Sequence, residues 1–167
     1  SLPTDLLKVL RKSFLDTIGV AAIGSTTQMS SIARKVAPIL YGANGPSASR
    51  MLMDGRAVSP AGAAMAGAMT IDSVDAHDGT TPNKGHVGSA VFPGLLALAD
   101  AQINNGSRIT GAEFAAHLAV GYEVSCRAGQ VQHATCPDYH TSGAWTAVGV
   151  AVACARMLRA DAAQIQH

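Results

Sequence analysis

Three segments rich in small apolar residues constrain the fold of this chain more than any other feature. They cover about residues 60–74, 90–104 and 143–158, and alanine, glycine and valine are frequent in them. In the first of these segments small residues occupy every face of the helix, which indicates close approach by neighbouring helices on all sides. The sequence therefore predicts an all-α fold with these helices packed at its centre.

The remaining helices are expected to flank this centre. Of the 167 residues, 48% are apolar and only 4% aromatic, so the core must be built mainly from aliphatic side chains. One helix is predicted over residues 5–24, with Thr4 as its N-cap. A second opens at Ser30 or Ser31, and Pro38 ends or kinks it. A further helix spans residues 111–127.

Local capping patterns mark several helix starts. Thr110 and Glu113 form a capping box, in which each side chain accepts from the other residue's backbone N–H. Ser59 precedes Pro60, as an N-cap precedes a proline at the first helical position. Between these patterns, Asp54-Gly55 separates two short apolar runs and predicts one small β-hairpin near residues 49–58.

Several classes of protein are excluded by charge and composition. The net charge is +1 without a basic stripe, so no nucleic-acid partner is expected. Glycine, proline or a charge interrupts each apolar stretch before membrane-spanning length, so no membrane partner is expected either. Three cysteines without a CxxC pair or a signal peptide favour reduced thiols and a cytoplasmic location.

Two polar loops interrupt the apolar helices and carry most of the reactive side chains. The loops cover residues 75–89 and about 129–142, and each directly precedes an Ala/Gly-rich helix. If these helices pack side by side, both loops emerge at one end, where helix N-termini favour a bound carboxylate. The reactive residues are Asp75, His77, Asp78, Lys84 and His86 in the first loop, and His133, Asp138 and His140 in the second.

This set suits acid–base chemistry on an anion. Histidine exchanges protons near neutral pH, an aspartate fixes its tautomer, and Lys84 can pair with a substrate carboxylate. Simpler interpretations stay open. His77 and Asp78 can cap the turn, Lys84 can be a solvated surface lysine, and His140 can be a helix cap.

Other reaction classes find less support. A metal site built from His77, Asp78, His86 and His140 has no HExxH-type spacing, so no metal is expected. The chain contains no GxSxG, GxGxxG or Walker motif, and Cys136 has no evident partner base.

Several separated motifs resemble the MmgE/PrpD family in order along the chain. They are RKSFLDTIGVAAIG, IDSVDAHDGTTPNKGHVGSAVFPGLLALAD, GAEFAAHLAVGYEVSCRAG, YHTSGAWTAVGVAVACARML and RADAAQI. The family includes 2-methylcitrate dehydratase, cis-aconitate decarboxylase and iminodisuccinate epimerase. The resemblance implies a helical domain with a smaller α/β lid domain, a homodimer, no metal or organic cofactor, and proton transfer at a carbon next to a carboxylate.

The resemblance also implies roles for individual residues. Asp75 and Asp78 match the family's paired aspartates, His86 its first histidine and His140 its later one. Gly79 and Val87 stand where many members have threonine and proline. Thr80 and Thr81 are candidates for the missing hydroxyl. The expected catalytic residues are therefore Asp75, His86 and His140, and the expected substrate-binding residues are Asp78, Thr80, Thr81 and Lys84.

The expected function is part of a lyase or isomerase that acts on small di- or tricarboxylic acids. The capping pattern at Asp161 and Gln164 is followed by few residues. We therefore expect residues 1–167 to be a partial helical domain, truncated at its C-terminal end, lacking the lid and inactive alone. The expected partners are a polycarboxylate substrate and a second copy bound through helical faces. The alternatives are a non-catalytic helical interaction module and a metal-dependent hydrolase.

Overall fold

The computed structural model describes residues 2–138 and 141–166, and the all-α prediction is confirmed. The elements are α1 (Thr4–Gly24), α2 (Gln28–Leu40), β1 (Ser49–Arg50), β2 (Ala57–Val58), α3 (Pro60–Asp72), the 3-10 turn η1 (Thr81–Asn83), α4 (Gly88–Asn104), α5 (Gly111–Thr135), α6 (Ser142–Met157) and α7 (Ala162–Gln166). No helix in the described part of the chain combines the length and apolar character needed to cross a bilayer.

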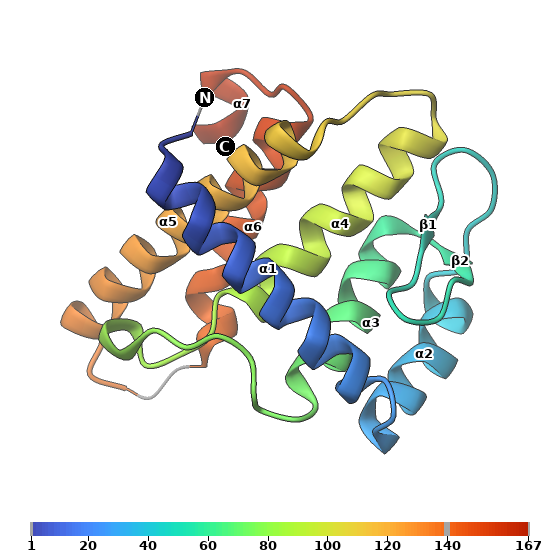
Figure 1. Ribbon diagram of the computed structural model, residues 1–167, viewed down its shortest axis with the longest axis horizontal. Helices are drawn as coiled ribbons and strands as arrows, with labels where there is room; N and C mark the ends of the chain where they lie inside the picture. The colour runs from blue at the N-terminus through green and yellow to red at the C-terminus, as the bar shows by residue number, and fades with distance from the viewer. Residues whose placement is uncertain (1, 139–140, 167) are drawn as a thin grey trace.

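The helices form a layer that α1 crosses on one face (Figure 1). Within the layer α2 packs on α3, α3 on α4, α4 on α6, and α6 on α5, while α1 contacts α3, α4 and α5. The predicted central helices α3, α4 and α6 thus have neighbours on several sides. Their small side chains make this close packing possible.

The pair α5 and α6 shows how close these helices come. A Cβ atom on Gly149 of α6 would lie 2.5 Å from the backbone oxygen of Gly121 in α5. One on Gly129 would lie 2.9 Å from the ring of Trp145. These distances are shorter than a carbon atom permits, so glycine is required where the two helices cross. Trp145 is itself fully buried between them.

Aromatic packing joins α1 to this layer. Phe14 of α1 meets Phe92 of α4 edge-to-face, with ring centroids 5.3 Å apart. Phe114 of α5 contacts both rings in the same manner. Edge-to-face contacts of this kind are favourable because the ring edge is positive and the ring face negative. The three phenylalanines of the chain therefore meet where α1 crosses α4 and α5.

Three predicted helix starts are confirmed. Ser59 Oγ accepts from the backbone N–H of Gly62 at 3.2 Å. In the capping box, Thr110 Oγ1 accepts from Glu113 N–H at 3.2 Å, and Glu113 accepts from Thr110 N–H at 2.8 Å. Asp161 and Gln164 make the same reciprocal bonds, both at 2.9 Å. Each pattern lies within four residues, so the sequence alone is sufficient to specify it.

The N-caps predicted for the first two helices are wrong. Pro3, not Thr4, precedes α1, and its carbonyl accepts the first helical bond from Leu7 N–H at 3.0 Å. Helix α2 starts at Gln28, because Thr27 rather than Ser30 or Ser31 caps it, with Thr27 Oγ1 3.2 Å from Ser30 N.

Pro38 lies inside α2, two residues before its end. A proline has no N–H to donate to the carbonyl four residues earlier. That carbonyl, of Arg34, instead accepts from Arg56 Nη2 at 2.9 Å. A side chain from the hairpin therefore supplies the hydrogen bond that the proline removes.

Helix α5 is longer than predicted and ends at Thr135 rather than near residue 127. The expected second polar loop, from about residue 129, is correspondingly shorter. Gly129 lies inside the helix, where Trp145 packs against it. As a consequence, His133 lies in the last turn of α5 and not in a loop.

The predicted β-hairpin is confirmed but short. Ser49 pairs with Val58 and Arg50 with Ala57. A six-residue connection joins the strands, with positive φ at Met53 (58°) and Gly55 (87°). Arg50 fastens the hairpin to α4, because its backbone N–H donates to Asp100 Oδ2 at 2.7 Å and its guanidinium pairs with the same carboxylate.

Asp100→Asn is expected to lower the melting temperature more at pH 7 than near pH 3. The side-chain and backbone hydrogen bonds from Arg50 hold the pKa of Asp100 below its ordinary value. Stability from such a group is present above the unfolded pKa, about 3.9, and is lost as pH falls through the folded pKa. Thermal melts at the two pH values measure this. An equal deficit at both would contradict the ion-pair explanation.

Candidate active site

A cavity of about 820 Å³ lies where the two polar loops meet. Its wall includes residues from the end of α3, the first loop, the end of α5 and the start of α6. Those with reactive side chains include Asp72, Lys84, His86, His133, Cys136, Asp138 and Ser142. The sequence-based expectation that both loops reach one pocket therefore agrees with the fold.

The first loop is fixed by its own backbone. Thr80 N–H donates to the carbonyl of Gly85 at 2.9 Å, and η1 lies between the two residues. Lys84 adopts a left-handed conformation with φ 50°. A Cβ on Gly85 would overlap Ser142 Oγ and lie 2.8 Å from Trp145 Cζ2. Glycine therefore allows the loop to rest directly on the first turn of α6.

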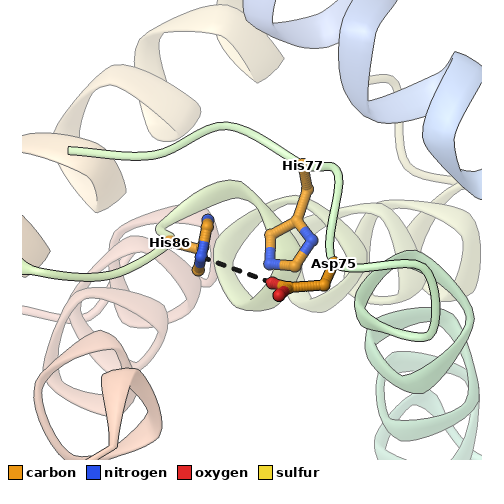
Figure 2. A group of neighbouring side chains, drawn as sticks. All are labelled: Asp75, His77 and His86. Atoms are coloured by element: carbon orange, nitrogen blue, oxygen red, sulfur yellow. Dashed lines mark ion pairs between the residues drawn. The ribbon is translucent and has the colours of Figure 1, made fainter.

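His86 is held in one orientation by two hydrogen bonds. Its Nδ1 lies 2.7 Å from the carbonyl oxygen of Asp78, and its backbone N–H donates to Ser142 Oγ at 3.3 Å. A carbonyl can only accept, so Nδ1 of the neutral ring carries the proton. Nε2 then has a free lone pair. The Nε2 atom lies 3.7 Å from Asp75 Oδ1 (Figure 2).

Asp78 ties this loop to two helices. Its Oδ2 accepts from the hydroxyl of Tyr122 at 2.6 Å, and its Oδ1 accepts from Gly88 N–H at 3.0 Å. Burial, and then the Asp78 carboxylate, raise the pKa of the Tyr122 hydroxyl far above its ordinary value, so the hydroxyl remains a donor. Both carboxylate oxygens of Asp78 are thus already engaged, and its role in binding substrate remains a prediction.

Tyr122→Phe is expected to reduce the free energy of unfolding by about 1–3 kcal/mol, because it leaves a carboxylate oxygen of Asp78 without its donor. It should also loosen the carbonyl that fixes the proton on His86 Nδ1. Urea unfolding measures the first effect, and side-chain ¹⁵N shifts of His86 measure the second. Tyr41→Phe is the control, because Tyr41 has no side-chain hydrogen bond within the described residues. Equal stability of the two variants would refute the assignment.

Asp75 and His77 lie beside His86 but differ in exposure. Asp75 has a positive φ of 48°, and 87% of its side chain is exposed. The His77 ring is buried against His86, with ring centroids 4.1 Å apart, and its Nε2 lies 3.1 Å from Asp72 Oδ1. Burial, and then the neighbouring His86, lower the pKa of His77, so its ring is neutral at pH 7.

The other predicted residues have varied locations. Lys84 lines the cavity, whereas Thr80 is half-buried and Thr81 is exposed, and neither is part of the cavity wall. His133 and Asp138 line the cavity. His140 lies outside the described residues. His117 lies in a different cavity, where its Nδ1 is 3.0 Å from Arg156 Nη1.

Three residues of this region were not among the expected catalytic or substrate-binding residues, although His77 was counted among the reactive side chains of the first loop. His77 was considered as a turn cap or a weak metal ligand, and only the fold places its ring against His86. Tyr122 lies in mid-helix, where nothing in the sequence distinguishes it from a core tyrosine. Ser142 follows the N-cap Thr141 of α6, and this position next to a helix start was the available clue.

The comparison with known families agrees with this arrangement. The model of the MmgE/PrpD N-terminal domain matches residues 1–167. The chain belongs to the MmgE/PrpD family. No curated protein and no solved structure matches this MmgE/PrpD domain. Family membership indicates dehydratase-like chemistry, and it is consistent with a polar cavity at the helix ends of a packed helical domain.

Proposed function

We propose that this MmgE/PrpD domain forms the acid–base part of a lyase or isomerase that acts on small di- or tricarboxylic acids, as 2-methylcitrate dehydratase does. The observation that carries the proposal is the free lone pair of His86 Nε2, since Nδ1 is held by the Asp78 carbonyl at 2.7 Å. His86 also lines the cavity, so a substrate in the cavity can reach it.

Each residue has a defined part in the proposed reaction. Lys84 binds a substrate carboxylate at the cavity wall. His86 Nε2 takes a proton from the carbon next to that carboxylate. Asp75, 3.7 Å away, stabilises the resulting imidazolium. By the resemblance alone, His140 is the second acid–base residue, and Thr80 and Thr81 remain substrate-binding candidates.

The charge of the cavity limits what this domain can do alone. Asp72 and Asp138 oppose an anionic substrate, and Lys84 is the one lysine or arginine among the described residues of the wall. A developing carbanion needs more positive charge than this. We therefore propose that turnover requires basic residues from outside residues 1–167, and that the isolated domain has little activity.

The test is proton exchange at the substrate carbon in deuterated water, followed by NMR. The complete gene product is incubated with 2-methylcitrate, cis-aconitate or iminodisuccinate. Exchange or conversion of at least one acid is expected, together with little or none by residues 1–167. Absence of exchange with every polycarboxylate tested would overturn the enzyme proposal, and full turnover by residues 1–167 would overturn the need for additional basic residues.

Exposed apolar side chains on α1 and α2 support the second candidate, a helical interaction module. Leu15, Ile39 and Leu40 are 72%, 79% and 67% exposed. We propose that these faces bind a second copy of the protein. Sedimentation measures this directly, and a module without catalysis would assemble but exchange no substrate proton.

A cytoplasmic location is part of the proposal, because the three cysteines are free thiols.

A further inference from the structure

We propose that Asp75, His77 and His86 bind one transition-metal ion of the Zn²⁺ class. The three side chains come from the two ends of the first loop and converge on one point (Figure 2). One potential ligand atom from each lies within 4.8 Å of those of the other two. Two imidazoles and one carboxylate suit zinc, iron, nickel or copper, whereas magnesium and calcium prefer sites made of oxygen atoms alone.

His77 gives independent support. Its side chain is 0% exposed, and neither ring nitrogen has a hydrogen-bond partner in the described part of the chain. The Asp72 oxygen lies 3.1 Å from Nε2, but it is not in hydrogen-bonding geometry, and a neutral ring forms no ion pair with it. A buried polar group without a partner costs about 1–3 kcal/mol. A bound ion would satisfy one of these nitrogens.

His86 is already arranged as metal-binding histidines usually are. Its Nδ1 donates to the Asp78 carbonyl at 2.7 Å, which directs the Nε2 lone pair away from that carbonyl. Histidines that bind metals almost always donate their second N–H to a carbonyl or carboxylate in this way. The side chain of Asp78 in turn accepts hydrogen bonds from the Tyr122 hydroxyl and the Gly88 N–H, which hold this residue in place. The ligand is therefore oriented before an ion arrives.

The distances require only a modest closure of the site. Zinc bonds of about 2.1 Å place tetrahedral ligand atoms about 3.4 Å apart. The present spread of up to 4.8 Å must therefore contract by up to about 1.4 Å. Asp75 can provide much of this movement, because 87% of its side chain is exposed. Asp72 and Asp78 add negative charge near the point where the ion would lie, which favours a cation.

Metal binding and proton transfer would use the same lone pair of His86. The ion would therefore inhibit the reaction proposed above, and this consequence rests on that proposed function. The binding itself does not rest on it, because it is measured without substrate.

The experiment uses untagged protein, stripped with a chelator and titrated with Zn²⁺ alone by calorimetry. One ion per chain is expected, and Co²⁺ should give the visible absorption of a site with nitrogen ligands. Asp75→Asn, His77→Gln and His86→Gln should each weaken binding at least about 10–100-fold, the loss known for residues that only support a metal ligand. His117→Gln, in the other cavity, is the matched control.

Two results would overturn the site. One is the absence of stoichiometric binding by the native chain. The other is binding that His86→Gln and Asp75→Asn leave unchanged. Asp75 is at the surface, so Asp75→Asn tests the proposal even if removal of the buried His77 prevents folding. If Zn²⁺ binds as expected but does not slow an active enzyme, the metal site stands and His86 is not the base.

Discussion

His86→Gln in the complete gene product is expected to lower turnover of a polycarboxylate substrate by about 10²–10⁴-fold, the range for loss of a positioned acid or base. Glutamine keeps a polar side chain of similar length at the cavity wall but has no nitrogen that can accept a proton. The fold should therefore survive, since the main contacts of the loop are made by Asp78, Gly85 and the backbone.

Steady-state kinetics and a far-UV circular dichroism spectrum measure the two halves of this prediction. His117→Gln serves as the control, because it removes a partly buried histidine from the other cavity, beside Arg156. It should leave turnover close to that of the native protein. If His86→Gln kept more than a tenth of native turnover, His86 would not be the base, and another residue of the cavity wall would have to take the proton.

Gly149→Ala is expected to cost about 2–3 kcal/mol of unfolding free energy, the range for forcing an atom into a well-packed core. The new Cβ would lie 2.5 Å from the backbone oxygen of Gly121 and would overlap Ser125 Oγ. Serine can rotate away, but the backbone of α5 can move only if the helix moves as a whole. This cost exceeds the gain of about 1 kcal/mol that alanine normally brings to a helix.

Gly19→Ala is the matched control for this substitution. Gly19 is also helical, but a Cβ there meets nothing within 4 Å. This variant should gain about 0.5–1 kcal/mol, because alanine reduces the entropy of the unfolded chain. Urea unfolding of both variants gives the comparison. Similar stability changes in the two would show that α5 and α6 do not cross as closely as described.

The sequence alone determined the features that depend on neighbouring residues. The capping bonds of Ser59, Thr110 and Asp161 each join residues three positions apart, and the hairpin near residues 49–58 depends on a short local turn. The three small-residue segments also indicated correctly that α3, α4 and α6 would be packed among other helices. For the site, the sequence predicted that the two polar loops meet, and the family motif added Asp75, Asp78 and His86 as candidates, whose roles stay predictions.

Only the tertiary structure decided the rest, because the deciding contacts join residues far apart in the chain. Trp145 of α6 packs against Gly129 inside α5, and Arg56 supplies the bond that Pro38 removes from α2. The hydroxyl of Tyr122 donates to the carboxylate of Asp78, and the two residues are 44 positions apart in the sequence. Burial of His77 against His86 follows from the same packing. Local preferences can place a helix start, but the partner of a buried polar group depends on which helices come together.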